Sequence, residues 1–169
     1  MRPKRSTWLA IAMLFGLTMD LAGHRASAQQ TDSLEVVKAE FVGNYELMQY
    51  VTFQPGGEVI PRDYVARIMY DPLGNMSAIG MPSDLPHRVE ATGDERTIGG
   101  FAYFGRVDID VAAGTVTHHV IGAPMRPELV GQGRVRYYAF DGDLLTLSIK
   151  DESGRMSGQL TWRRMWAGK

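Results

Sequence analysis

Hydrophobic and polar residues alternate along most of the chain after residue 42, in short runs that turn residues separate. A period of two is typical of β-strands that bury one face. The pattern predicts eight strands, which are Gly43–Phe53, Tyr64–Asp71, Met76–Met81, Phe101–Ile109, Thr115–Ile121, Gln132–Phe140, Leu144–Lys150 and Gln159–Met165. In the first strand we expect Tyr45, Leu47 and Val51 on the apolar face and Tyr50 on the opposite face.

Short turns join nearly all of these strands, for example Asp71–Asn75 and the Asp141-Gly142-Asp143 hairpin. Eight consecutive antiparallel strands favour an all-β fold, an up-and-down barrel without an exposed edge, over a two-sheet sandwich. Residues 82–98 lose the alternation. Thr92-Gly93-Asp94-Glu95 is similar to a helix capping box, so we expect one short helix between the third and fourth strands.

The N-terminus has the order of a secretory signal peptide. Arg2, Lys4 and Arg5 precede the apolar run of residues 8–19, and Ala26-Ser27-Ala28 offers a small-residue cleavage site. The run is too short for a membrane span, which needs about 20 apolar residues. We therefore expect that residues 1–28 are removed, that residues 29–41 form a helical or flexible lead-in to a barrel domain of residues 42–166, and that the protein is periplasmic or secreted without stable membrane insertion.

Composition narrows the function classes. The 169 residues include no cysteine, which excludes disulfides, thiolate metal sites and a cysteine nucleophile. The net charge of −1 becomes −4 once the four basic residues and one acidic residue of positions 1–28 are removed. Nucleic-acid binding needs a basic surface, so a nucleic-acid partner is not expected.

Several segments together carry a resemblance to a known family. They are Val42-Gly43-Asn44-Tyr45-Glu46-Leu47, the hairpin of residues 66–77, Phe101-Ala102-Tyr103-Phe104-Gly105, residues 114–120 and Leu160-Thr161-Trp162-Arg163-Arg164. In this order they resemble the bacterial and fungal lipocalin-like domain family, a calycin-type barrel, over residues 42–165. The resemblance implies an eight-stranded barrel and assigns no activity. It also implies structural roles for Gly43, for Tyr45 in place of the usual tryptophan, and for an arginine, Arg164, packed over that aromatic ring.

Two adjacent histidines, His118 and His119, are the candidates for acid–base chemistry. Neighbours on a strand point to opposite faces, so the pair cannot hold one metal ion. One of them is expected inside the barrel, and the sequence does not decide which. The plainer alternative is a histidine that a neighbouring hydroxyl or carbonyl satisfies, as buried polar groups usually are.

Arg134, Arg136 and Tyr138 share one face of their strand. Facing inward, they could hold a carboxylate, since guanidinium binds carboxylates through two hydrogen bonds. A similar Arg-x-Tyr grip occurs in fatty-acid-binding barrels, which this chain resembles only locally. The outward orientation is favoured because an isolated buried charge is costly.

A small apolar or amphipathic ligand, bound without covalent chemistry, is the principal functional hypothesis. The candidate ligand contacts are Tyr70, Met76, Tyr103, His119, Arg136, Tyr138 and Trp162. The alternatives are a proton-transfer enzyme of the isomerase, cyclase or hydratase type that uses an inward histidine, and a filled barrel that acts as an interaction module. Nucleotide-binding, zinc-protease and serine-hydrolase motifs are absent, and no cofactor or metal is expected.

Overall fold

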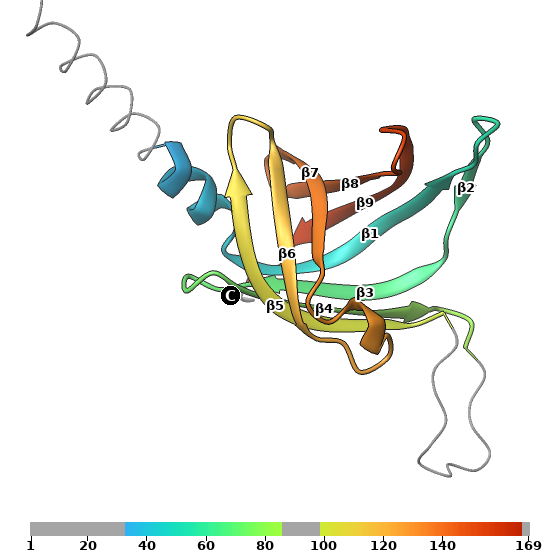
Figure 1. Cartoon of the computed structure of the whole chain (residues 1–169), viewed down its shortest axis with the longest axis horizontal. Coiled ribbons are helices and arrows are strands. Elements are labelled where there is room, and N and C mark those ends of the chain that lie inside the picture. Colours follow the sequence, from blue (N-terminus) through green and yellow to red (C-terminus); the bar gives the residue numbers. More distant parts are fainter. Residues whose placement is uncertain (1–32, 86–98, 167–169) are drawn as a thin grey trace, which may run out of the picture.

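The computed structural model describes residues 33–85 and 99–166 of the chain (Figure 1). The expected signal peptide, residues 1–28, lies outside the described residues. So does the expected helix at Thr92–Glu95. The described residues contain no helix that is long and apolar enough to cross a membrane.

The strands follow one another with short connections. Their bounds are β1 (Gly43–Phe53), β2 (Val59–Pro61), β3 (Tyr64–Tyr70), β4 (Asn75–Pro82), β5 (Phe101–Asp110), β6 (Thr115–Gly122), β7 (Gly133–Asp141), β8 (Leu144–Lys150) and β9 (Met156–Arg164), with a 3₁₀ turn η1 (Pro127–Leu129) before β7. All pairings are antiparallel. β2 and β3 pair with successive parts of β1, so β2 extends the second strand of the barrel.

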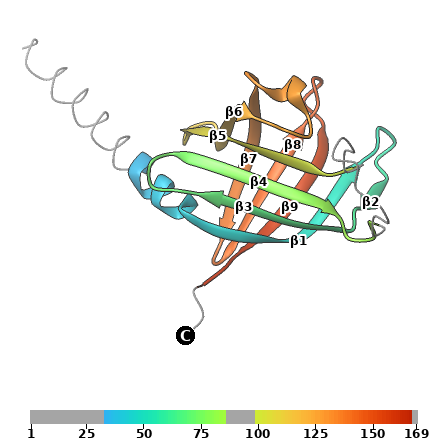
Figure 2. The same cartoon turned by 90° about the horizontal axis from the view of Figure 1, so that it is seen from below.

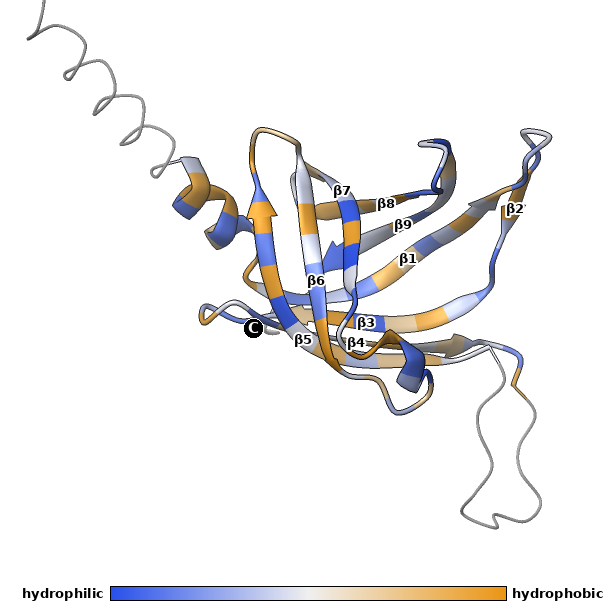
Figure 3. Cartoon of the chain, in the orientation of Figure 1, coloured by the Kyte–Doolittle hydropathy of each residue, from blue (hydrophilic) through white to orange (hydrophobic). Residues whose placement is uncertain are grey.

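The sheet closes because β1 pairs with β9 as well as with β3 (Figure 2). The prediction of a closed eight-stranded antiparallel barrel is therefore confirmed, and the two-sheet sandwich is excluded. Hydrophobic and hydrophilic residues alternate along the second half of β5, as Figure 3 shows. The alternation places one set of side chains in the barrel and the other in solvent.

The described helix spans residues 33–41 and lies before the first strand, at one end of the barrel (Figures 1 and 2). Its position differs from the expected one between the third and fourth strands. Val37 and Phe41 are one helical turn apart and both contact the barrel core, which explains why this polar segment is helical. Lys38 and Glu35 form an ion pair on its exposed side.

The helix joins β1 at a junction that contacts of Arg164 and Tyr45 close. The Arg164 guanidinium donates hydrogen bonds to the carbonyl oxygens of Glu40 and Val42. It also lies over the Tyr45 ring, 4.8 Å from the ring centroid. A Cβ at Gly43 would lie 2.5 Å from Arg164 Nη1, so a larger residue here would displace the guanidinium from its carbonyl partners. The structure thus brings Gly43, Tyr45 and Arg164 together.

Replacing Arg164 with methionine is expected to lower the free energy of unfolding by about 2–3 kcal/mol, because two charge-assisted hydrogen bonds to backbone carbonyls are lost. Arg163 is the matched control, since it is exposed on the outer face and pairs there with the partly exposed Glu46. Urea unfolding of both variants measures the difference. Equal losses for Arg164→Met and Arg163→Met would contradict the structural role of Arg164.

Candidate ligand-binding site

The barrel contains a cavity of about 280 Å³ that is partly open to solvent. Its apolar wall consists of Ile68, Ala78, Leu147, Ile149 and Leu160, and its aromatic wall of Tyr50, Tyr64, Phe101, Tyr103 and Trp162. His118, Arg134 and Arg136 form a polar wall, with Arg126 beside them. The volume is near the lower limit of the range of about 300–1,000 Å³ that is usual for small-molecule pockets.

His118 is the member of the histidine pair that points inward, and it has no exposed surface. Its Nε2 lies 3.0 Å from the Tyr70 hydroxyl, and its Nδ1 lies 3.1 Å from the Tyr103 hydroxyl. Both ring nitrogens therefore have partners. Burial, together with the charges of Arg136 and Arg134, lowers the pKa of His118 to about 3, so the imidazole is neutral at physiological pH.

His119 points outward. Its Nε2 lies 2.8 Å from Asp108 Oδ2, and both side chains are exposed to solvent. His119 therefore does not border the cavity, and its choice as a ligand contact is not supported by the structure. The physical reason is the strand period of two: once His118 is inside, its neighbour is outside.

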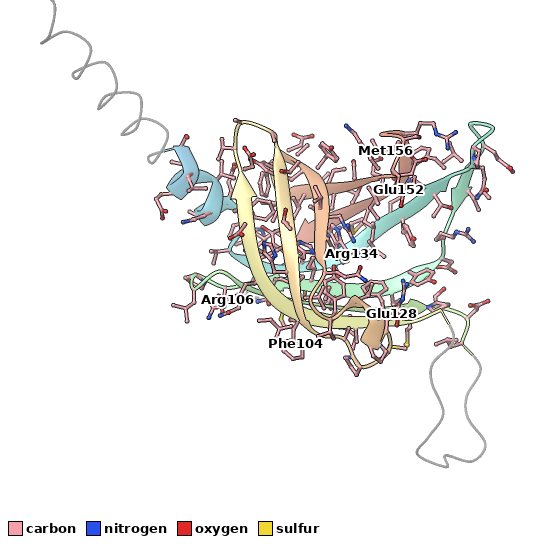
Figure 4. The ribbon with its side chains drawn as sticks, in the orientation of Figure 1. Phe104, Arg106, Glu128, Arg134, Glu152 and Met156 are labelled. Atoms are coloured by element: carbon pink, nitrogen blue, oxygen red, sulfur yellow. The ribbon has the colours of Figure 1, made fainter. Side chains whose placement is uncertain are left out.

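Arg134 and Arg136 face the interior, so the outward orientation favoured from the sequence is wrong. The register decides it, because His118 lies opposite Arg134 and Val116 lies opposite Arg136 across the β6–β7 ladder. Paired residues share a face of the sheet, and both β6 partners are fully buried. Figure 4 shows Arg134 within the ring of strands and Phe104 on the outer side of β5.

Neither of these two arginines forms an ion pair with any residue in the described part of the chain. Arg136 is only 9% exposed, and its Nη1 donates to the carbonyl oxygen of Val135. Burial and the neighbouring Arg136 lower the pKa of Arg134. One buried and one partly buried guanidinium group thus face the cavity without a compensating carboxylate among residues 33–85 and 99–166, which is a costly arrangement for an empty barrel.

The other candidate contacts divide between the cavity and the closed end. Tyr103 and Trp162 line the cavity. Tyr70, Met76 and Tyr138 pack into the core outside the cavity lining, and Tyr138 contacts the Phe41 ring that fills this end. Tyr70 reaches the site only through His118. Within the same cavity, the indole Nε1 of Trp162 is buried and has no acceptor among the described residues.

Sequence reasoning missed Tyr50 and Tyr64 as cavity residues. Tyr64 shares the parity of Tyr70 on the same strand, so alternation alone could have identified it. Tyr50 was expected on the outer face. A register shift between Leu47 and Gln49 exchanges the inward and outward positions of β1 after the bulge, so Tyr50 points inward. No residue type in this segment predicts such a bulge.

The sequence profile of a family described as the lipocalin-like domain matches residues 42–165, the segment that forms the closed barrel. The chain belongs to the lipocalin-like domain family. No curated protein sequence matches this lipocalin-like chain. A hollow lipocalin-like barrel with one polar wall is suited to hold a molecule that has one apolar and one polar end.

Proposed function

We propose that this lipocalin-like protein binds a small amphipathic molecule inside the barrel, without covalent chemistry. The observation that carries the proposal is the barrel cavity whose polar wall holds the buried Arg136 and the partly buried Arg134, neither of which has a counter-charge among the described residues. An anionic end of the ligand would supply that charge, and guanidinium groups are well suited to bind it.

The apolar and aromatic walls support the other half of the proposal. Ile68, Leu147 and Leu160 face the cavity from three different strands, and the small side chain of Ala78 lines it from a fourth. Burying an apolar tail against these side chains is favourable by about 25 cal/mol for each Å² removed from water. We further propose that the protein acts after export, on the basis of the signal-peptide pattern in residues 1–28.

Native mass spectrometry of the protein, purified gently from its host, tests both parts. We expect a one-to-one adduct that is lost on denaturation, and a chain mass that lacks residues 1–28. In Ala78→Leu the larger side chain fills the cavity, so the adduct should disappear. Ala102→Leu is the matched control, because Ala102 precedes the cavity residue Tyr103 on β5 and so points away from the cavity. Wild-type protein that always arrives without an adduct would contradict ligand binding.

A proton-transfer enzyme is a second candidate, and one observation favours it. His118 borders the cavity as a neutral imidazole, 3.1 Å from the Tyr103 hydroxyl. Neutral histidine and tyrosine are common acid–base groups, and an isomerase, cyclase or hydratase would use them. The two functions differ in the fate of the bound molecule. A ligand is released from the barrel chemically unchanged, whereas a substrate is released as a product. The third possibility, a filled barrel that acts only as an interaction module, is disfavoured by the cavity.

A further inference from the structure

Tyr70, His118 and Tyr103 form a chain of hydrogen bonds that ends at the cavity. A neutral imidazole has one N–H donor and one acceptor nitrogen, so two arrangements of the chain are possible. In one, Nε2 carries the proton and donates to Tyr70. In the other, Nδ1 carries the proton and donates to Tyr103. The distances of 3.0 Å and 3.1 Å fit both arrangements.

The burial of Tyr70 distinguishes them. Tyr70 is 4% exposed, and His118 Nε2 is the partner that the described residues provide for its hydroxyl. Burial also raises the pKa of Tyr70, so the hydroxyl keeps its proton and needs an acceptor. If Nε2 were protonated, this O–H would be buried without an acceptor in the described part of the chain. Tyr70 must therefore donate to Nε2, which leaves the proton of His118 on Nδ1.

The direction of the second hydrogen bond follows. His118 Nδ1–H donates to the Tyr103 oxygen, so the proton of the Tyr103 hydroxyl is not used by His118. Tyr103 lines the cavity beside Arg134 and Arg136, whose positive charges act on it, and no acceptor for its proton is found among the residues described. Burial raises the pKa of Tyr103, so the group stays a donor at neutral pH.

We propose that Tyr103 is the specificity-determining residue of the cavity, a hydrogen-bond donor to a carboxylate oxygen of the ligand, with Tyr70 acting through His118 as a positioning residue. The inference rests on the proposed binding function. Arg134 and Arg136 provide the charge for the carboxylate, and Tyr103 provides a directed neutral donor next to them. A ligand whose polar end is only a hydrogen-bond donor would face three donors and would be rejected.

The protonation of His118 is tested directly by ¹⁵N NMR of the imidazole in the intact protein near pH 7.5. We expect a protonated Nδ1 and an unprotonated Nε2. The opposite tautomer would overturn the inference, whether or not a ligand binds. This measurement does not depend on the proposed function, so the two can fail separately.

The donor role is tested by isothermal titration calorimetry with octanoate and octanol as probes. We expect wild-type protein to prefer octanoate, and Tyr103→Phe to weaken octanoate binding by about 10-fold to 100-fold with a smaller loss for octanol. Tyr137→Phe is the matched control, because Tyr137 lies outside the cavity lining on β7, where its ring contacts Lys150.

The outcomes separate the two ideas. An unchanged octanoate preference in Tyr103→Phe, with wild-type binding intact, would overturn the inference and leave the proposed function standing. Wild-type protein that binds neither probe would contradict an amphipathic anionic ligand, and the carboxylate assignment with it. Equal losses in Tyr103→Phe and Tyr137→Phe would also overturn the inference, because they would show that the loss of binding does not depend on a hydroxyl in the cavity.

Discussion

Replacing Phe41 with alanine is expected to lower the free energy of unfolding by about 3–5 kcal/mol, because a large buried ring is removed and a void remains. Phe41 is 2% exposed and closes the end of the barrel. Its ring centroid lies 5.0–5.2 Å from the centroids of Tyr70, Tyr138 and Phe140, with edge-to-face geometry in each pair. Pairs of this kind contribute beyond their buried area.

Equilibrium unfolding in urea measures this effect. Val36→Ala is the control, since Val36 is 65% exposed on the same helix and its truncation removes little buried surface. A Phe41→Ala loss below about 1 kcal/mol would mean that the helix of residues 33–41 is not an integral part of the barrel. Fluorescence and circular dichroism should give one transition, because the ring belongs to the main core cluster.

His118 is expected to make the protein less stable in mild acid. The folded-state pKa of His118 is lowered to about 3, whereas the unfolded chain has a value near 6.5. Between these values the unfolded state binds a proton that the folded state excludes, so stability is complete above about pH 6.5 and is lost as the pH falls toward 3. From pH 6 to pH 4 this contributes a loss of about 2–3 kcal/mol.

Thermal or urea unfolding at several pH values, for wild type and His118→Gln, isolates this contribution. The variant should lose less stability between pH 6 and pH 4 than the wild type does. His119→Gln is the matched control, because His119 is exposed at the adjacent position of the same strand. Its replacement should leave the loss of stability between pH 6 and pH 4 as large as in the wild type. Parallel pH profiles for wild type and His118→Gln would show that the imidazole is not excluded from protonation.

The barrel could be predicted from the sequence because alternation and turn residues are local signals that the tertiary structure reinforces. The short turn of Asp71–Asn75 is an example, since Asp71 accepts hydrogen bonds from the backbone N–H groups of Leu73 and Asn75. The orientation of the site residues is harder to predict. Alternation separates two faces without saying which is inside, so it does not decide between His118 and His119. The cost of burying charge predicts the wrong orientation for Arg134 and Arg136.

The errors share a physical origin. The rule that buried charge is costly favours an outward orientation for Arg134 and Arg136, and the cavity that both residues line is an exception to this rule. Tyr50 was misplaced for a different reason, because one extra residue in β1 reverses the phase of every later side chain in that strand. The helix of residues 33–41 packs on the barrel through contacts of Phe41 with aromatic side chains from distant strands. The sequence near Phe41 therefore does not predict this packing.

The closure of the barrel between β1 and β9 also has a consequence for how the chain folds. Glu46 and Arg163, which pair across this seam, are 117 residues apart. Contacts of such long range give a high contact order, which slows folding. Until Met156–Arg164 has been synthesised, β1 and β8 each present an unpaired edge that can pair with another chain. The last strand of the barrel is therefore the one that protects a newly made chain from aggregation.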